Sequence, residues 1–192
     1  MKDNKSWQKT LSRLKTGNIN FINDNLNNDL QNSNRRKAVV DGQKPFAIVL
    51  ACSDSRIVPE LIFDTGISEL FVIRVAGNIA NPSSIASIEY AVAYLDVKLI
   101  VVLGHQNCGA VTAALAGGDN GKNIDHLLNF IQPAILTSHS KKVDDVSRIH
   151  TKLTTERLKN DSNIITKAIE NEVLKIIPAY YSLETGQVDF FE

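Results

Sequence analysis

The chain has 192 residues, of which 43% are hydrophobic and five are proline. This length and hydrophobic content are enough to build one sizeable core. Lysine plus arginine equals aspartate plus glutamate at 21 each, so no net charge gathers nucleic acid or an anionic membrane surface. No apolar run approaches the roughly 20 residues that span a bilayer, and the first ten residues lack the apolar core of a signal peptide. We expect a single domain over 1–192 in the cytoplasm, or in the periplasm if a leader has been removed, with no nucleic-acid or membrane partner.

The first 40 residues predict a helical arm. Residues 6–18 predict a helix that ends near Gly17, because apolar side chains recur there at three- and four-residue spacing, at Trp7, Leu11 and Leu14. The asparagine-rich stretch 23–34 predicts a loop or a frayed helix. Since the apolar stripe has no obvious partner in its own chain, we expect the arm 1–40 to lie across a neighbouring subunit.

The remaining core, 45–192, alternates between strands and helices. Continuous apolar runs predict strands covered on both faces, at 45–51, 69–76 and 98–104. Helical patterns occupy the stretches between and after them, at 84–95, 108–117, 123–135 and 144–173, the last with a break at 160–162. The run 174–191 predicts a hairpin. The predicted fold class is α/β, with a mostly parallel central sheet flanked by helices and a C-terminal edge hairpin.

Reactive side chains follow two of the predicted strands. Cys52 comes directly after the strand at 45–51, and His105 follows the strand at 98–104, with Cys108 three residues later. The carboxyl ends of parallel strands form the binding crevice of open α/β sheets, so Cys52, His105 and Cys108 can converge there. Two thiolates and one imidazole leave the fourth tetrahedral position of Zn²⁺ to water, which is the pattern of a catalytic site.

Other interpretations of these residues stay open at this stage. The two cysteines also suit a disulfide, and Cys52 suits an ordinary core position, although a reducing cytosol favours metal ligands or free thiols. Asp54 and Arg56 follow closely, and charged groups just beyond a buried strand are expected to bind each other or a metal-bound species, or to form a plain loop ion pair. The remaining histidines are expected on solvated helix faces: His126, His139 and His150.

About half of the chain resembles the β-class carbonic anhydrases of the bacterial type. The most specific match is C-x-D-x-R at 52–56 followed by H-x-x-C at 105–108. The wider matching stretches are 51–64, 69–78, 87–111 and, more loosely, 176–191. The resemblance implies a mainly parallel sheet, with active sites at the interface of a homodimer that often pairs into a homotetramer.

The resemblance also implies the site. It assigns Cys52, His105 and Cys108 as ligands of Zn²⁺, and Asp54 with Arg56 as the catalytic dyad. The implied activity is reversible hydration of carbon dioxide to bicarbonate and a proton, by zinc-bound hydroxide. Asp54 would accept the hydrogen of the bound water or hydroxide, and Arg56 would hold Asp54 in place and off the metal.

The chain departs from patterns within this family in two respects. Members with a regulatory bicarbonate site carry tryptophan three residues before the first zinc cysteine, whereas this chain has Val49. We therefore expect the ordinary form of the enzyme, in which water is the fourth zinc ligand. Some relatives place a substrate-binding glutamine where this chain has Thr65 and Gly66. Two other functions stay open, because the motifs alone do not decide between them and hydration: hydrolysis of carbonyl sulfide or carbon disulfide on the same scaffold, and a non-catalytic, zinc-stabilised assembly protein. The presence of Asp54 and Arg56 argues against the second.

Overall fold

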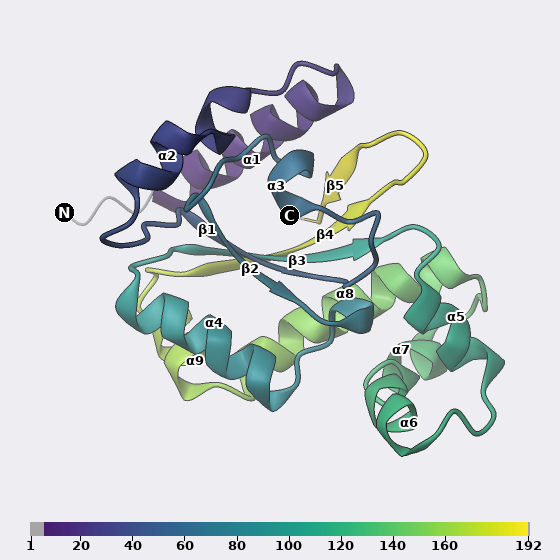
Figure 1. Cartoon of the computed structure of the whole chain (residues 1–192). Coiled ribbons are helices and arrows are strands. Elements are labelled where there is room, and N and C mark those ends of the chain that lie inside the picture. Colours follow the sequence, from purple (N-terminus) through teal and green to yellow (C-terminus); the bar gives the residue numbers. More distant parts are fainter. Residues whose placement is uncertain (1–5, 192) are drawn as a thin grey trace.

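A five-stranded sheet with helices on both faces forms the centre of the protein (Figure 1). The structure is a computed structural model and describes residues 6–191. The strand order is β2-β1-β3-β4-β5, and every neighbouring pair is parallel except β4 and β5. The strands are β1 (Ala47–Ala51), β2 (Leu70–Arg74), β3 (Leu99–His105), β4 (Lys175–Tyr181) and β5 (Val188–Phe190). The predicted mostly parallel sheet and its C-terminal edge hairpin are both confirmed.

The two central strands are buried on both faces, which explains their unbroken apolar sequences. Successive side chains point to opposite faces of a sheet, so each strand contributes to two separate cores. One core receives Ala47, Val49, Ala51, Leu99, Val101 and Leu103. The other receives Ile48, Leu50, Ile100 and Val102. Both strands are therefore held rigidly, and so are the residues that follow them.

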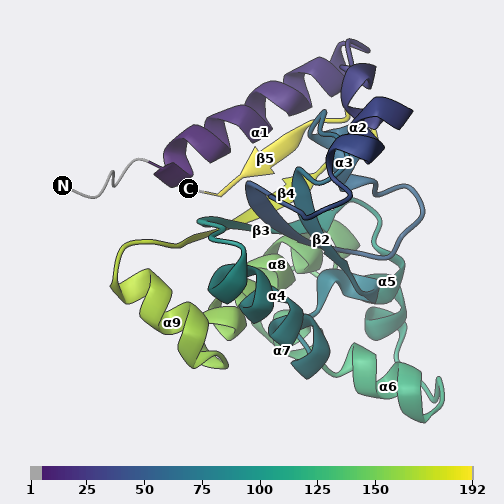
Figure 2. The same cartoon turned by 60° about the vertical axis from the view of Figure 1, so that its left-hand side comes forward.

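Helices cover both faces of the sheet and one of its edges. On one face lie α1 (Ser6–Ile22), α2 (Ser33–Ala38) and α3 (Pro59–Ile62), and on the other α4 (Pro82–Tyr94), α8 (Val143–Asn160) and α9 (Asn163–Glu170) (Figures 1 and 2). Beyond the carboxyl ends of the parallel strands lie α5 (Gly109–Ala116), α6 (Lys122–Leu128) and α7 (Gln132–Thr137). Short 3-10 turns are η1 (Asn28–Gln31) and η2 (Ala76–Asn78). No helix in the span 6–191 is long and apolar enough to cross a membrane.

Two helical predictions need correction. The single helix predicted over 123–135 is two, α6 and α7, because Pro133 lacks the N–H that would continue a helix and instead lies in the first turn of α7. The first helix does not end at Gly17 but runs to Ile22. A Cβ on Gly17 would lie 1.9 Å from the carbonyl oxygen of Phe63, so this glycine permits close packing of α1 on α3.

The apolar stripe of α1 does have a partner in its own chain, contrary to the prediction. Leu11 and Leu14 are buried in the same core as Val49 and Leu103, and Trp7 packs against it. The helix lies along the sheet (Figure 2). The sequence pattern could not reveal this, because β1 and β3 are apolar on both faces and either face could have received the helix. The stripe therefore gives no reason to place α1 on a neighbouring subunit.

Candidate metal centre

Three buried side chains converge at the carboxyl edge of the sheet. The Sγ atoms of Cys52 and Cys108 and a ring nitrogen of His105 all lie within 4.8 Å of one another. All three residues are buried, and both cysteines are free thiols. The structure thus brings together the three residues that the strand ends predicted, and it holds both cysteines as free thiols rather than as a disulfide.

The fold accounts for each position. Cys52 is the first residue after β1 and His105 is the last of β3, and the parallel register sets Ala51 opposite Leu103, so both strands end at one edge. Cys108 is the N-cap of α5. Between His105 and Cys108, Asn107 adopts a left-handed φ of 53° and donates its backbone N–H to Asp144 Oδ1 at 2.8 Å. This tight turn folds Cys108 back toward His105.

The imidazole of His105 presents an unused nitrogen to the two sulfurs. Its Nδ1 lies 2.9 Å from the carbonyl oxygen of Gln106, which can only accept, so Nδ1 carries the proton. Nε2 is therefore a bare acceptor, and it is buried without a hydrogen-bond partner among residues 6–191. Buried polar atoms rarely stay unpaired, and a nitrogen lone pair beside two sulfurs matches the donor set that Zn²⁺ prefers.

The surroundings of the thiols favour one negative charge and oppose a second. Cys108 donates to Cys52 and thereby lowers the pKa of Cys52, and backbone N–H groups lower it further: Gly77 N lies 3.2 Å and Asp54 N 3.4 Å from Cys52 Sγ. The same contact, together with burial, raises the pKa of Cys108. Ionising both sulfurs therefore requires a cation between them, which a divalent metal provides.

Asp54 and Arg56 form a two-point ion pair beside the cluster. Arg56 donates from Nε to Asp54 Oδ1 at 2.9 Å and from Nη2 to Oδ2 at 2.7 Å, and its backbone N–H donates to Oδ1 at 3.0 Å. The hydrogen bonds from Arg56 hold the pKa of the Asp54 carboxyl well below its usual range. Asp54 is thus an ionised acceptor in a fixed orientation.

A second arginine, not identified from the sequence, fixes the same loop. Arg74, at the end of β2, donates from Nε to the carbonyl oxygen of Cys52 at 3.1 Å and from Nη2 to that of Asp54 at 2.7 Å. The sequence offered one signal for Arg74, which is that a charged residue ends an otherwise apolar strand. Because it binds the two carbonyls on either side of residue 53, Arg74 orients both a candidate ligand and a candidate catalytic group.

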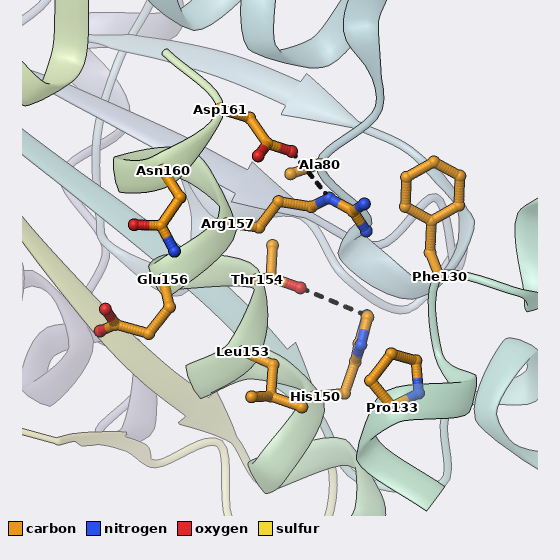
Figure 3. A pocket seen from close by; sticks show the side chains of 10 residues that line it. All are labelled: Ala80, Phe130, Pro133, His150, Leu153, Thr154, Glu156, Arg157, Asn160 and Asp161. Atoms are coloured by element: carbon orange, nitrogen blue, oxygen red, sulfur yellow. Dashed lines mark hydrogen bonds and ion pairs between the residues drawn. The ribbon is translucent and has the colours of Figure 1, made fainter. Parts of the chain in front are cut away.

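The prediction of solvated helix faces for the other histidines is correct only for His126, which is exposed on α6. His139 is exposed too, but it lies in the loop between α7 and α8, and only 2% of His150 is exposed. His150 lies on α8 and borders a cavity of about 330 Å³ together with Pro133 and Thr154 (Figure 3). Helical spacing alone could not reveal that this face of α8 packs against the sheet, because the face is lined mainly by serine and threonine.

Known proteins with related sequences and structures agree on one family. The carbonic anhydrase family profile matches residues 47–188. Carbonic anhydrase 2 of Mycobacterium tuberculosis is 36% identical over 181 residues, covering 91% of this chain and 87% of that protein. The carbonic anhydrase of Mycolicibacterium smegmatis is 34% identical over 183 residues, covering 92% and 89%. A tetrameric β-carbonic anhydrase of Sordaria macrospora superposes with a TM-score of 0.76 at 27% identity, covering 83% of this chain and 87% of that one.

Proposed function

Because the chain belongs to the carbonic anhydrase family and is a β-class enzyme of it, we propose that it hydrates carbon dioxide reversibly to bicarbonate and a proton at a zinc ion held by Cys52, His105 and Cys108. The observation that carries the proposal is the buried Cys-His-Cys cluster with an ionised carboxylate oriented beside it. A cluster that served only as a structural tie would have no use for that carboxylate.

The donor set suits zinc. Two sulfurs and the unprotonated Nε2 of His105 are the soft and intermediate ligands that Zn²⁺ takes, and three protein ligands leave one position for a reactant. When bound, zinc supplies the Lewis acidity that makes water a usable nucleophile near neutral pH. The backbone N–H groups of Gly77 and Asp54 stabilise the charge on the Cys52 sulfur.

Asp54 would accept the hydrogen of the reacting water. Its Oδ1 already accepts two hydrogen bonds from Arg56, whereas Oδ2 accepts one and keeps a lone pair for a further donor. We therefore assign Oδ2 as the accepting atom. With its hydrogen held there, the oxygen of the water keeps a lone pair directed at the carbon of carbon dioxide.

Arg56 would act by holding Asp54. Both prongs of its guanidinium bind the carboxylate, and Nη2 also reaches the carbonyl oxygen of Asn107 at 3.3 Å. The carboxylate is thereby kept from turning toward the cation-binding cluster and joining it as a ligand. Arg74 supports the same orientation from the backbone side.

Assembly into a homodimer or homotetramer belongs to the proposal. The related Sordaria macrospora enzymes are described as tetrameric. In the described part of this chain, β2 forms an open edge of the sheet, and Tyr90 and Tyr94 stand exposed on the neighbouring helix α4. An open strand edge beside exposed aromatic side chains suits contact with a second copy. A cytoplasmic location likewise stays a prediction.

Parallel assays on one zinc-loaded preparation test the proposed function. Stopped-flow measurement of carbon dioxide hydration and a sulfide-release assay with carbonyl sulfide are made on the same protein, with its zinc content determined. We expect kcat/KM to be higher for carbon dioxide. A higher value for carbonyl sulfide would assign the sulfur substrate instead. Absence of both activities in protein that holds one zinc per chain would assign a non-catalytic role.

A further inference from the structure

A buried histidine outside the cluster is connected to it through one glycine. His150 Nε2 lies 2.7 Å from the carbonyl oxygen of Gly77, and the N–H of the same glycine donates to Cys52 Sγ at 3.2 Å. A carbonyl oxygen can only accept, so His150 carries its proton on Nε2 and is the donor. Thr154 Oγ1 also lies near that nitrogen, at 3.5 Å.

Gly77 needs such an anchor because its backbone is unusual. It has a left-handed φ of 71°, and a Cβ there would lie 3.1 Å from Ala110 Cβ and 3.1 Å from Ile131 Cδ1. The residue therefore has glycine's freedom to rotate, yet its N–H must point at one sulfur. The peptide group that carries the Gly77 carbonyl is held at its other end by Asn78, whose N–H donates to the carbonyl oxygen of Val75 at 2.8 Å, and His150 holds its carbonyl end.

We infer that His150 is a positioning residue of the metal centre: its Nε2–H holds the carbonyl of Gly77 and so keeps the N–H of Gly77 on the sulfur of Cys52. The inference rests on the proposed metal centre. A hydrogen bond to a ligating thiolate withdraws electron density from the sulfur, so His150 sets how strongly Cys52 donates to the metal. It does this without touching the metal or the substrate.

The surroundings of His150 keep the ring neutral and leave room for replacements. Burial lowers the pKa of His150 to about 4, so near neutral pH it is an uncharged donor. One side of the ring borders the cavity of Figure 3, which is also lined by Leu153 and Pro133. A leucine at 150 therefore finds apolar neighbours and open volume, and glutamine can place an amide N–H near the position of Nε2.

Cobalt-substituted protein provides a spectroscopic test that does not depend on activity. Thiolates bound to Co²⁺ show a near-ultraviolet sulfur-to-metal charge-transfer band, whose energy falls when a hydrogen bond to the sulfur is lost. We expect His150→Leu to shift this band to longer wavelength. Metal affinity should fall about tenfold or more, because the Cys52 thiolate loses the hydrogen bond that stabilises its charge and fixes its position. His150→Gln should restore both toward the wild type. The matched control His126→Leu, at an exposed histidine, should change neither.

The outcomes separate this inference from the proposed function. A folded His150→Leu variant with the wild-type band, or a His150→Gln variant shifted as far as His150→Leu, overturns the role of His150 while the metal centre stands. Absence of any thiolate-to-cobalt band in the wild type overturns both. If His150→Leu does not fold, His150→Asn takes its place, because its shorter amide does not reach Gly77 and the same shift is expected.

Discussion

Gly104 and Thr151 lie in such close contact that a Cβ on the glycine would come within 2.1 Å of the threonine Oγ1. This contact seats α8 directly on β3, one residue before His105, and the residue before Thr151, His150, donates to the carbonyl oxygen of Gly77. The hydroxyl of Thr151 is committed to the carbonyl oxygen of Ser147 at 2.8 Å, so it cannot turn away without losing a buried hydrogen bond.

The first prediction concerns this contact. Gly104→Ala should lower the free energy of unfolding by about 1–3 kcal/mol, because the added methyl must displace α8 or the hydroxyl. Urea unfolding of the metal-loaded protein measures the change. Gly42→Ala is the matched control, since among residues 6–191 no atom beyond its own chain neighbours lies within 4 Å of the added Cβ, and it should stay within about 0.5 kcal/mol of the wild type.

A second substitution identifies the cause of the Gly104→Ala effect. Adding Thr151→Ala removes the Oγ1 that the new methyl would meet, so the double variant should be less destabilised than the sum of the two single variants. Strict additivity would show that the two residues do not clash and that the packing described for α8 on β3 is wrong.

The second prediction concerns Asp54. Asp54→Asn keeps the size of the side chain but removes the charge and the acceptor that Oδ2 offers, so kcat for carbon dioxide hydration should fall about 10²-fold or more with zinc retained. The control is Asp96→Asn, an exposed aspartate at the amino end of β3 whose left-handed φ of 54° asparagine tolerates. If kcat for carbon dioxide hydration by Asp54→Asn stays within about twofold of the wild-type value, the Asp54–Arg56 pair is an ordinary loop ion pair with no catalytic role.

The third prediction concerns Arg74. Arg74→Lys keeps the charge but cannot bind the carbonyl oxygens of Cys52 and Asp54 at once, because a single ammonium replaces the two-pronged guanidinium. We expect kcat/KM to fall about tenfold, a typical effect of losing a group that orients metal ligands. Kinetics and zinc content measured together check this. Unchanged kinetics would mean that the loop keeps its shape without Arg74.

The fourth prediction concerns pH and His150. The pKa of His150 is about 4 in the folded protein and 6.5 in the unfolded chain. Between pH 6.5 and 4, His150 therefore binds a proton in the unfolded chain but stays neutral in the folded protein. Stability from this residue is therefore complete above pH 6.5 and is lost as pH falls toward 4. Wild-type stability should decline more steeply than that of His150→Gln, by about 1.4 kcal/mol per pH unit in that window. Equal slopes in urea unfolding between pH 6 and 4.5 would contradict the buried neutral state.

The sequence predicted well whatever depends on unbroken apolar runs. The central strands β1 and β3 are apolar at every position up to their ends, so the residues that follow, Cys52 and His105, could be placed at one edge of a sheet. The resemblance to β-class carbonic anhydrases was confirmed by the family and structural relatives. The roles of the site residues and the division into an arm at 1–40 and a core at 45–192 stay predictions.

What the sequence could not predict depends on which surfaces meet. The spacing of Leu11 and Leu14 predicts an apolar helix face but does not identify the surface that covers it. In the structure both residues pack on the sheet of the same chain. Thr151 and Thr155 look like solvated positions, yet both are buried, because their hydroxyls bond to carbonyls one turn earlier in α8. His150 lies on this same buried face of α8, so the prediction that it is solvated was wrong.

Metal content tests the central claim most directly, since the claim is that Cys52, His105 and Cys108 together hold the catalytic zinc. Elemental analysis of purified wild type and of Cys108→Ala, both checked for folding by circular dichroism, is sufficient. The account predicts about one zinc per chain in the wild type and far less in the variant, because one thiolate and one imidazole bind zinc weakly. An active wild-type protein with well under one zinc per chain, or a Cys108→Ala variant with full zinc, would contradict it.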